Sequence, residues 1–117
     1  MKPKYSFFKN FKYAREGFYS AVKKEKSLRL ELVAFIVLTL TALFLSVPIV
    51  WKAVLIASLL VPIIAELLNS AIEMVVDMIT SQYDESAKFA KDVAASAVML
   101  SITFSALVWI GVLVYFW

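Results

Sequence analysis

Three long apolar runs make up most of this chain and restrict its fold more than any other feature. We expect them to cross a membrane as helices over residues 30–50, 53–77 and 92–117, because about 20 residues at about 1.5 Å each span a bilayer core of ~30 Å. With a mean hydropathy of +0.84 and 18% charged residues, the 117-residue chain could not cover so much apolar surface in water. The sequence therefore predicts an all-α membrane protein with one domain, residues 1–117.

The segment before the first run combines aromatic and basic residues. At ~100° per residue, Phe7, Phe11 and Phe18 fall on one side of a helix, and Lys12 falls opposite. Aromatic residues on one face with lysines on the other are typical of a helix that lies on a membrane surface. We expect this amphipathic surface helix over residues 7–26. A soluble helix packed against protein is the alternative.

The distribution of basic residues predicts the orientation in the membrane. Nine of the twelve Lys and Arg residues precede residue 30. Anionic headgroups and the positive-inside rule explain this load better than nucleic-acid binding does. With three spans, the N-terminus and the polar segment 78–92 lie on the same side, which we expect to be cytoplasmic. The C-terminus is then on the opposite side.

The residues that are missing limit the chemistry. The chain has no Cys and no His, which excludes thiolate nucleophiles and removes the usual transition-metal ligands. Its two glycines, Gly17 and Gly111, cannot form a phosphate-binding loop, which needs clustered glycines. A nucleotide bound here must therefore be held by metal ions and side chains.

One face of the second predicted span carries a stripe of polar residues. Glu66, Asn69, Glu73 and Asp77 are spaced by three, four and four residues, which places them within ~80° on a helix. These four residues, the polar stripe, would be costly facing lipid, so they must face protein, water or ions. An all-oxygen cluster suits Mg²⁺. For Asp77 alone, a solvated helix end is the alternative.

A second polar cluster opens the third predicted span. Lys91 and Asp92 stand at its start, and Lys88 lies one helical turn earlier. This cluster is a second candidate for a part in the chemistry on the cytoplasmic side. Anchoring of the lysines at lipid headgroups is an equally simple interpretation.

Two segments carry a resemblance to a known family. The chain reads ELLNSAIE from Glu66 to Glu73, continues as VVD up to Asp77, and contains Ala90-Lys91-Asp92. These segments resemble the prokaryotic diacylglycerol kinase family, which includes undecaprenol kinases, and the match extends over nearly the whole chain. The resemblance implies a homotrimer in the bacterial inner membrane. Each subunit would have a surface helix and three spans, and active sites would lie between neighbouring chains.

The resemblance also implies roles for individual residues. Glu66 would be the general base, and Glu25 and Glu73 would hold the metal ions. The residues that would contact ATP are Tyr13, Glu25, Glu73, Asp77, Tyr83, Lys91 and Asp92. The residues that would contact the lipid are Arg29, Glu31, Lys52, Glu66 and Asn69.

The implied reaction is ATP- and Mg²⁺-dependent phosphorylation of a membrane lipid alcohol. The Glu-Leu-Leu-Asn-Ser-Ala sequence and the pair Arg29 and Glu31 favour diacylglycerol, which would become phosphatidic acid. The segment 87–95 looks more like the undecaprenol kinases, so undecaprenol is the alternative lipid. A small proton-coupled exporter also uses a membrane-embedded Glu, but three spans and a polar stripe argue against it.

Overall fold

The computed structural model describes residues 6–117, so the first five residues of the predicted domain lie outside the described part. The described residues form four helices: α1 (Phe7–Lys24), α2 (Lys26–Phe44), α3 (Ile49–Ile79) and α4 (Glu85–Phe116). α2, α3 and α4 are each long and apolar enough to cross a membrane. The predicted fold class, an all-α protein with an N-terminal amphipathic helix and three spans, is confirmed.

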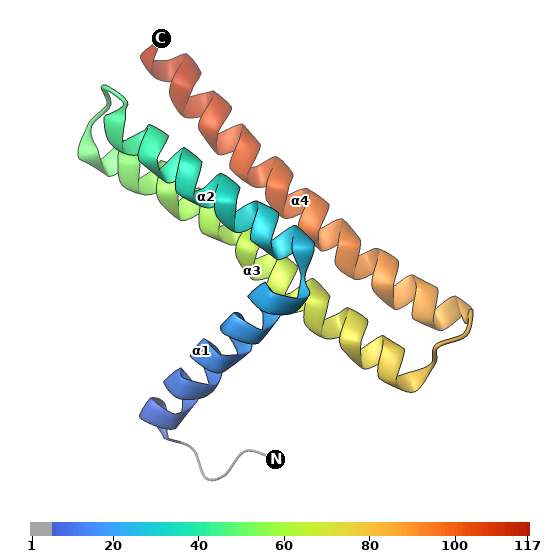
Figure 1. Ribbon diagram of the computed structural model, residues 1–117. Helices are drawn as coiled ribbons and strands as arrows, with labels where there is room; N and C mark the ends of the chain where they lie inside the picture. The colour runs from blue at the N-terminus through green and yellow to red at the C-terminus, as the bar shows by residue number, and fades with distance from the viewer. Residues whose placement is uncertain (1–5) are drawn as a thin grey trace.

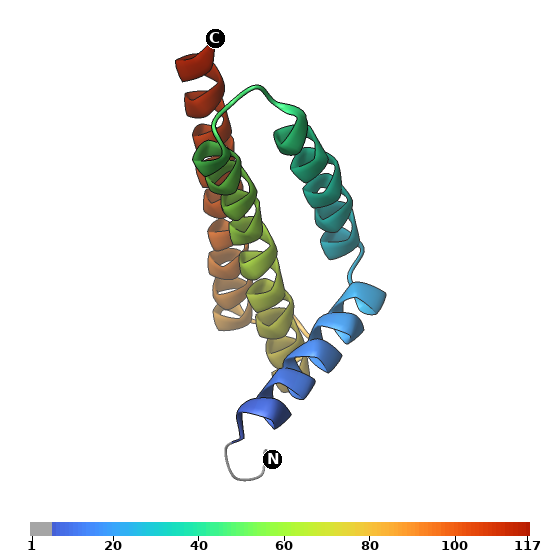
Figure 2. The same cartoon turned by 90° about the vertical axis from the view of Figure 1, so that its left-hand side faces the viewer.

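The three long helices form a bundle, and α1 projects from it at an angle (Figure 1). α3 packs along α4, and α2 packs against α3. Viewed from the side, α3 stands between α2 and α4 (Figure 2). α1 contacts the bundle through α2 and α3. The C-terminal end of α4 lies at the end of the bundle opposite α1 (Figure 1).

The buried core lies near that opposite end. Ala42, Leu55 and Val112 bring together one residue from each long helix and are at most 5% exposed. The Trp109 indole nitrogen donates a hydrogen bond to the Leu55 carbonyl over 3.2 Å, which links α4 to α3. This packing fixes the three helices relative to one another and leaves the other end of the bundle for the polar stripe.

The connection between α2 and α3 corrects the predicted bounds of the first two spans. The prediction carried the first span to residue 50, but α2 ends at Phe44 and Leu45 is extended. Pro48 has no N–H and a fixed φ, so it cannot continue α2, and it stands directly before the first residue of α3. α3 accordingly begins at residue 49 rather than 53, and it continues past the predicted end at 77 to Ile79.

The polar segment 78–92, expected to be a connection, is mostly helical. Only residues 80–84 separate α3 from α4. The Asp84 carboxylate accepts a hydrogen bond from the Ala87 amide over 3.0 Å, which caps the first turn of α4. The third long helix therefore begins at Glu85, seven residues before the predicted start of the span at residue 92.

The surface helix ends two residues earlier than predicted. Glu25 has extended backbone angles (φ −108°, ψ 111°) and separates α1 from α2. The chain turns at this residue, and α2 begins at Lys26 rather than residue 30. Along α1, Phe7, Phe8 and Phe11 are between 64% and 83% exposed, as a helix with a membrane-facing side requires.

Candidate active site

The polar stripe runs down α3 from the bundle interior to its surface. Glu66 and Asn69 are 6% and 7% exposed, Glu73 is half-buried and Asp77 is exposed. The Asn69 side-chain amide donates a hydrogen bond to Glu73 Oε1 over 2.9 Å. The Asn69 carbonyl oxygen, Oδ1, is buried without a hydrogen-bond partner. The spacing of these residues therefore produces the shared face that the sequence predicts.

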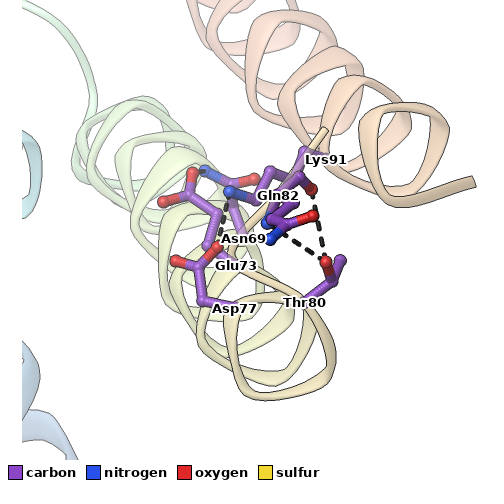
Figure 3. Close-up of polar contacts among 6 residues, drawn as sticks. All are labelled: Asn69, Glu73, Asp77, Thr80, Gln82 and Lys91. Carbon is purple, nitrogen blue, oxygen red and sulfur yellow. Dashed lines mark hydrogen bonds and ion pairs between the residues drawn. The ribbon is translucent and has the colours of Figure 1, made fainter. Parts of the chain in front are cut away.

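Lys91 connects this stripe to α4. Its ammonium group lies 2.7 Å from Asp77 Oδ1, and Figure 3 shows the side chain reaching from α4 toward the end of α3. Glu73 is also close enough to interact electrostatically with Lys91. The positive charge that three neighbouring carboxylates require thus comes, in part, from the facing helix.

A hollow of about 360 Å³ lies beside this pair at the turn between α3 and α4. Its lining includes Asp77, Tyr83, Lys91 and Asp92, four of the seven residues predicted to contact ATP. Lys88 also lines the hollow and forms an ion pair with Asp92 over 2.5 Å. The structure therefore brings these four predicted residues to one place, with acidic and basic groups around an open space.

Glu25 lies at a second hollow, between α1 and α3. This hollow has a volume of about 380 Å³, and Glu25, Ser70 and Met74 are among its lining residues. The Ser70 hydroxyl is buried without a hydrogen-bond partner.

Within residues 6–117, no three acidic side chains converge closely enough to form a metal site. The role of Glu25 and Glu73 as metal ligands therefore stays a prediction. Tyr13, also predicted to contact ATP, lies partly buried on α1.

Glu66 faces the first turns of α2. The Ser27 hydroxyl donates a hydrogen bond to Glu66 Oε1 over 2.8 Å. Glu31, one turn further along α2, is close enough for its charge to interact with that of Glu66. Glu31 Oε2 is buried without a hydrogen-bond partner. Two carboxylates therefore share this part of the bundle, and a hydroxyl group contacts one of them.

The residues predicted to contact the lipid are spread along the bundle. Glu31 lies at an apolar groove of about 380 Å³ between α2, α3 and α4, whose lining includes Phe35 and Trp109. Arg29 instead donates hydrogen bonds to the Val22 and Lys23 carbonyls at the end of α1.

Lys52, the third of these charged residues, lies at the far end of the bundle. Its ammonium group donates a hydrogen bond to the Leu43 carbonyl over 2.7 Å, at the C-terminal end of α2. Within one chain, Arg29, Glu31 and Lys52 therefore do not form one cluster.

Two residues at the site were not assigned a role from the sequence. Lys88 stood in the predicted cluster, and its pairing with Asp92 could have been predicted, because Lys and Asp four residues apart on a helix commonly pair. Ser27 could not, because its contact with Glu66 joins residues 39 positions apart and depends on the turn at Glu25.

Comparison with known proteins identifies the family. Residues 12–113 match the family described as prokaryotic diacylglycerol kinase. The chain is 37% identical over 97 residues to a diacylglycerol kinase of Escherichia coli, covering 83% of this chain and 80% of that protein. It is 34% identical over 104 residues to a diacylglycerol kinase of Haemophilus influenzae, covering 89% and 88% of the two chains. The chain therefore belongs to the prokaryotic diacylglycerol kinase family and is an ATP-dependent lipid kinase.

Proposed function

We propose that this protein phosphorylates diacylglycerol to phosphatidic acid, with Glu66 as the general base. The observation that carries the proposal is the position of Glu66. It is a buried carboxylate on the same helix face as Glu73 and Asp77, and Asp77 pairs with Lys91 at an open hollow. The relatives of Escherichia coli, Haemophilus influenzae and Pseudomonas aeruginosa are each named diacylglycerol kinase, which favours this lipid over undecaprenol.

The reaction is a direct transfer between two bound substrates. The lipid hydroxyl oxygen attacks the γ-phosphorus of ATP while its proton passes to Glu66. A new oxygen–phosphorus bond forms, the bond from the γ-phosphorus to the bridging oxygen breaks, and the electron pair leaves on ADP. Glu66 then returns the proton to water. This chemistry depends mainly on positioning and charge, so it requires no covalent intermediate on the protein.

The nucleotide would occupy the hollow at the α3–α4 turn. Lys91 would bring positive charge to the phosphates. The remainder of the nucleotide would contact Asp77, Tyr83 and Asp92. Tyr13 on α1 would also contact the nucleotide. The 2.7 Å pair between Lys91 and Asp77 holds the lysine toward the polar stripe. The γ-phosphate is then directed along α3 toward Glu66.

Mg²⁺ is the divalent ion that the side chains at the site favour. Glu73 and Glu25 would hold it, and the buried, unpartnered Oδ1 of Asn69 stands next to Glu73 as a further hard oxygen atom. When bound, the ion would neutralise charge on the phosphates. Glu73, which already accepts a hydrogen bond from Asn69, is fixed in orientation by that contact.

The lipid would enter from the membrane beside α2. The apolar groove between α2, α3 and α4 suits an acyl chain, and Glu31 lies at it close to Glu66. Arg29 and Asn69 lie near this end of the bundle, whereas Lys52 would contact lipid at the opposite end of the bundle. The lipid hydroxyl would then reach Glu66 at headgroup depth.

The functional unit is proposed to be a homotrimer in the bacterial inner membrane. Asp77 and Lys91 are about half exposed in a single chain, and such charges need protein or water rather than lipid around them. Neighbouring chains would enclose them. The basic N-terminal region and the α3–α4 turn face the cytoplasm, where ATP is available, and the C-terminus lies on the other side.

The lipid can be identified by a side-by-side assay. Purified protein in mixed micelles is supplied with MgATP and either diacylglycerol or undecaprenol, and the phosphorylated lipid is measured. We expect a higher kcat/KM on diacylglycerol. A higher value on undecaprenol would make undecaprenol the substrate and leave the kinase reaction as proposed. A lack of turnover with both lipids would contradict the proposed reaction.

A further inference from the structure

Ser27 occupies an unusual position for a helix-start serine. It is the second residue of α2, directly after the extended backbone of Glu25. Serine near a helix start commonly bonds to the nearby backbone. Here the hydroxyl donates instead to Glu66 Oε1 on α3, over 2.8 Å. The contact therefore links the α1–α2 turn directly to the buried carboxylate.

The surrounding packing holds Ser27 in place. Leu28, the next residue, is fully buried with 0% exposure, so it anchors the first turn of α2 in the bundle. Arg29 follows and bonds to the last carbonyls of α1, which fixes the angle of the turn. Ser27 therefore meets Glu66 between a buried anchor, Leu28, and a turn that Arg29 bridges with hydrogen bonds.

Glu66 needs such a contact because of its neighbours. Glu31 on α2 interacts electrostatically with it, and two like charges repel each other. Repulsion would favour other orientations of the Glu66 side chain. A hydrogen bond to an ionised carboxylate is stronger and more directional than one between neutral groups. The Ser27 bond occupies Oε1 and leaves Oε2 to accept a proton.

We propose that Ser27 is a positioning residue that orients Glu66 for proton abstraction from the lipid hydroxyl. The inference rests on the proposed role of Glu66 as the base and extends it to a residue on a different helix. Ser27 itself touches neither substrate. Its hydroxyl fixes which carboxylate oxygen faces the lipid, and misplacing a reacting group by about 1 Å can cost ~100-fold in rate.

Steady-state kinetics on three variants test the proposal. Ser27→Ala removes the donor and keeps the helix, because alanine is a good helix former. We expect kcat to fall about tenfold or more, with KM for MgATP unchanged. Ser27→Thr keeps a hydroxyl and should recover most of kcat. Ser101→Ala is the matched control, because the Ser101 hydroxyl bonds to the Val98 carbonyl of its own helix.

A double-mutant cycle separates positioning from a general structural role. In a Glu66→Gln background, Ser27→Ala should cause no further loss of the residual turnover, because its effect passes through Glu66. Equal losses in both backgrounds would overturn the proposal. A Ser27→Ala enzyme with a normal kcat would also overturn it. So would a variant whose only defect is a higher KM for MgATP, because that result would place the effect of the substitution at Glu25.

The same cycle distinguishes failure of this inference from failure of the proposed function. If Glu66→Gln turns over normally, Glu66 is not the base and both ideas fall. If Glu66→Gln is impaired while Ser27→Ala is normal, only the role of Ser27 falls. Thermal unfolding of every variant accompanies the kinetics. A Ser27→Ala loss that tracks a lower Tm, and that Ser27→Thr does not recover, would count against positioning.

Discussion

The oxygen atoms around Glu73 suggest how this chain can hold a nucleotide without a glycine-rich loop. Glu73 accepts a hydrogen bond from Asn69, whose own carbonyl oxygen is buried and unpartnered, and Lys91 approaches from α4. In a phosphate-binding loop, backbone amides would share the phosphate charge. Here side chains and the proposed bound cation would carry that charge, so we expect nucleotide affinity to depend strongly on divalent metal.

Glu73→Gln tests this dependence at the residue scale. The change keeps the size of the side chain and its contact with Asn69 but removes one negative charge. We expect the Mg²⁺ concentration needed for half-maximal turnover to rise by at least about tenfold, since a charged ligand is lost. Magnesium titrations of kcat at saturating ATP measure it, with Glu16→Gln on the exposed face of α1 as the control. ATP binding that is equally tight in EDTA would contradict the metal assignment.

Residue positions on a single helix could be predicted, and contacts between helices could not. The polar stripe follows from spacings of three and four residues, and Asn69 contacts Glu73 as that spacing requires. The contacts of Glu66 with Ser27 and of Asp77 with Lys91 join different helices. Their partners depend on how α2 and α4 pack against α3, which a helical period does not specify.

At the scale of elements, the turn between α1 and α2 links the amphipathic helix to the candidate site. Because the helix breaks at Glu25, the Val22 and Lys23 carbonyls have lost the amides that a continuous helix would supply. The Arg29 guanidinium takes the place of these amides and donates hydrogen bonds to the two carbonyls over 2.8 and 2.9 Å. Arg29 thereby stabilises the end of α1 and the position of Glu25.

Arg29→Gln should loosen α1 without unfolding the bundle. Losing two charge-assisted hydrogen bonds should raise amide hydrogen exchange in the last turns of α1 by about tenfold or more. Exchange in α3 and α4 should stay the same. Mass-spectrometric hydrogen exchange in detergent micelles measures both, with Arg15→Gln on the exposed side of α1 as the control. Equal protection of α1 in the two variants would show that Arg29 does not hold this turn.

Helix ends were harder to predict than helix types. Apolar runs and the amphipathic pattern give the four helices because burial and periodicity act over many residues. The ends depend on single residues instead. Pro48 starts α3 and the Asp84 side chain caps α4, and the predicted bounds used neither residue as a helix start. The capping position of Asp84 before Glu85 could have corrected the start of the third helix.

At the scale of the whole molecule, one chain leaves its site open. Asp77 is 58% exposed and Lys91 is 42% exposed, and large apolar side chains face outward along all three long helices. Lipid can cover the apolar faces but not the charged groups. Further copies of the chain are the simplest cover, which supports the proposed oligomer; the number three is what the resemblance to the family implies.

The oligomeric state can be measured directly. We expect the active protein in mild detergent to contain three chains, by light scattering corrected for bound detergent. Dilution into harsh detergent that yields single chains should abolish turnover, and return to mild detergent should restore both the mass and the activity. Fully active, monodisperse single chains would rule out a site that requires neighbours.

The central claim is that Glu66 takes the proton from the lipid hydroxyl, and Glu66→Gln tests it most directly. Glutamine keeps the side-chain size and can still accept the Ser27 hydrogen bond, but it does not act as a base. We predict that kcat falls by the ~10²–10⁴-fold typical of a lost general base. MgATP affinity should be unchanged and Tm equal or higher, because the repulsion from Glu31 is removed.

Turnover, MgATP affinity and Tm are therefore measured together on purified Glu66→Gln enzyme. Lost turnover with intact MgATP binding and an undiminished Tm is the predicted result. Near-normal kcat would eliminate Glu66 as the base. Loss of turnover together with loss of MgATP binding would contradict the account in a different way, making Glu66 a metal ligand and leaving Asp92 as the next candidate for the base.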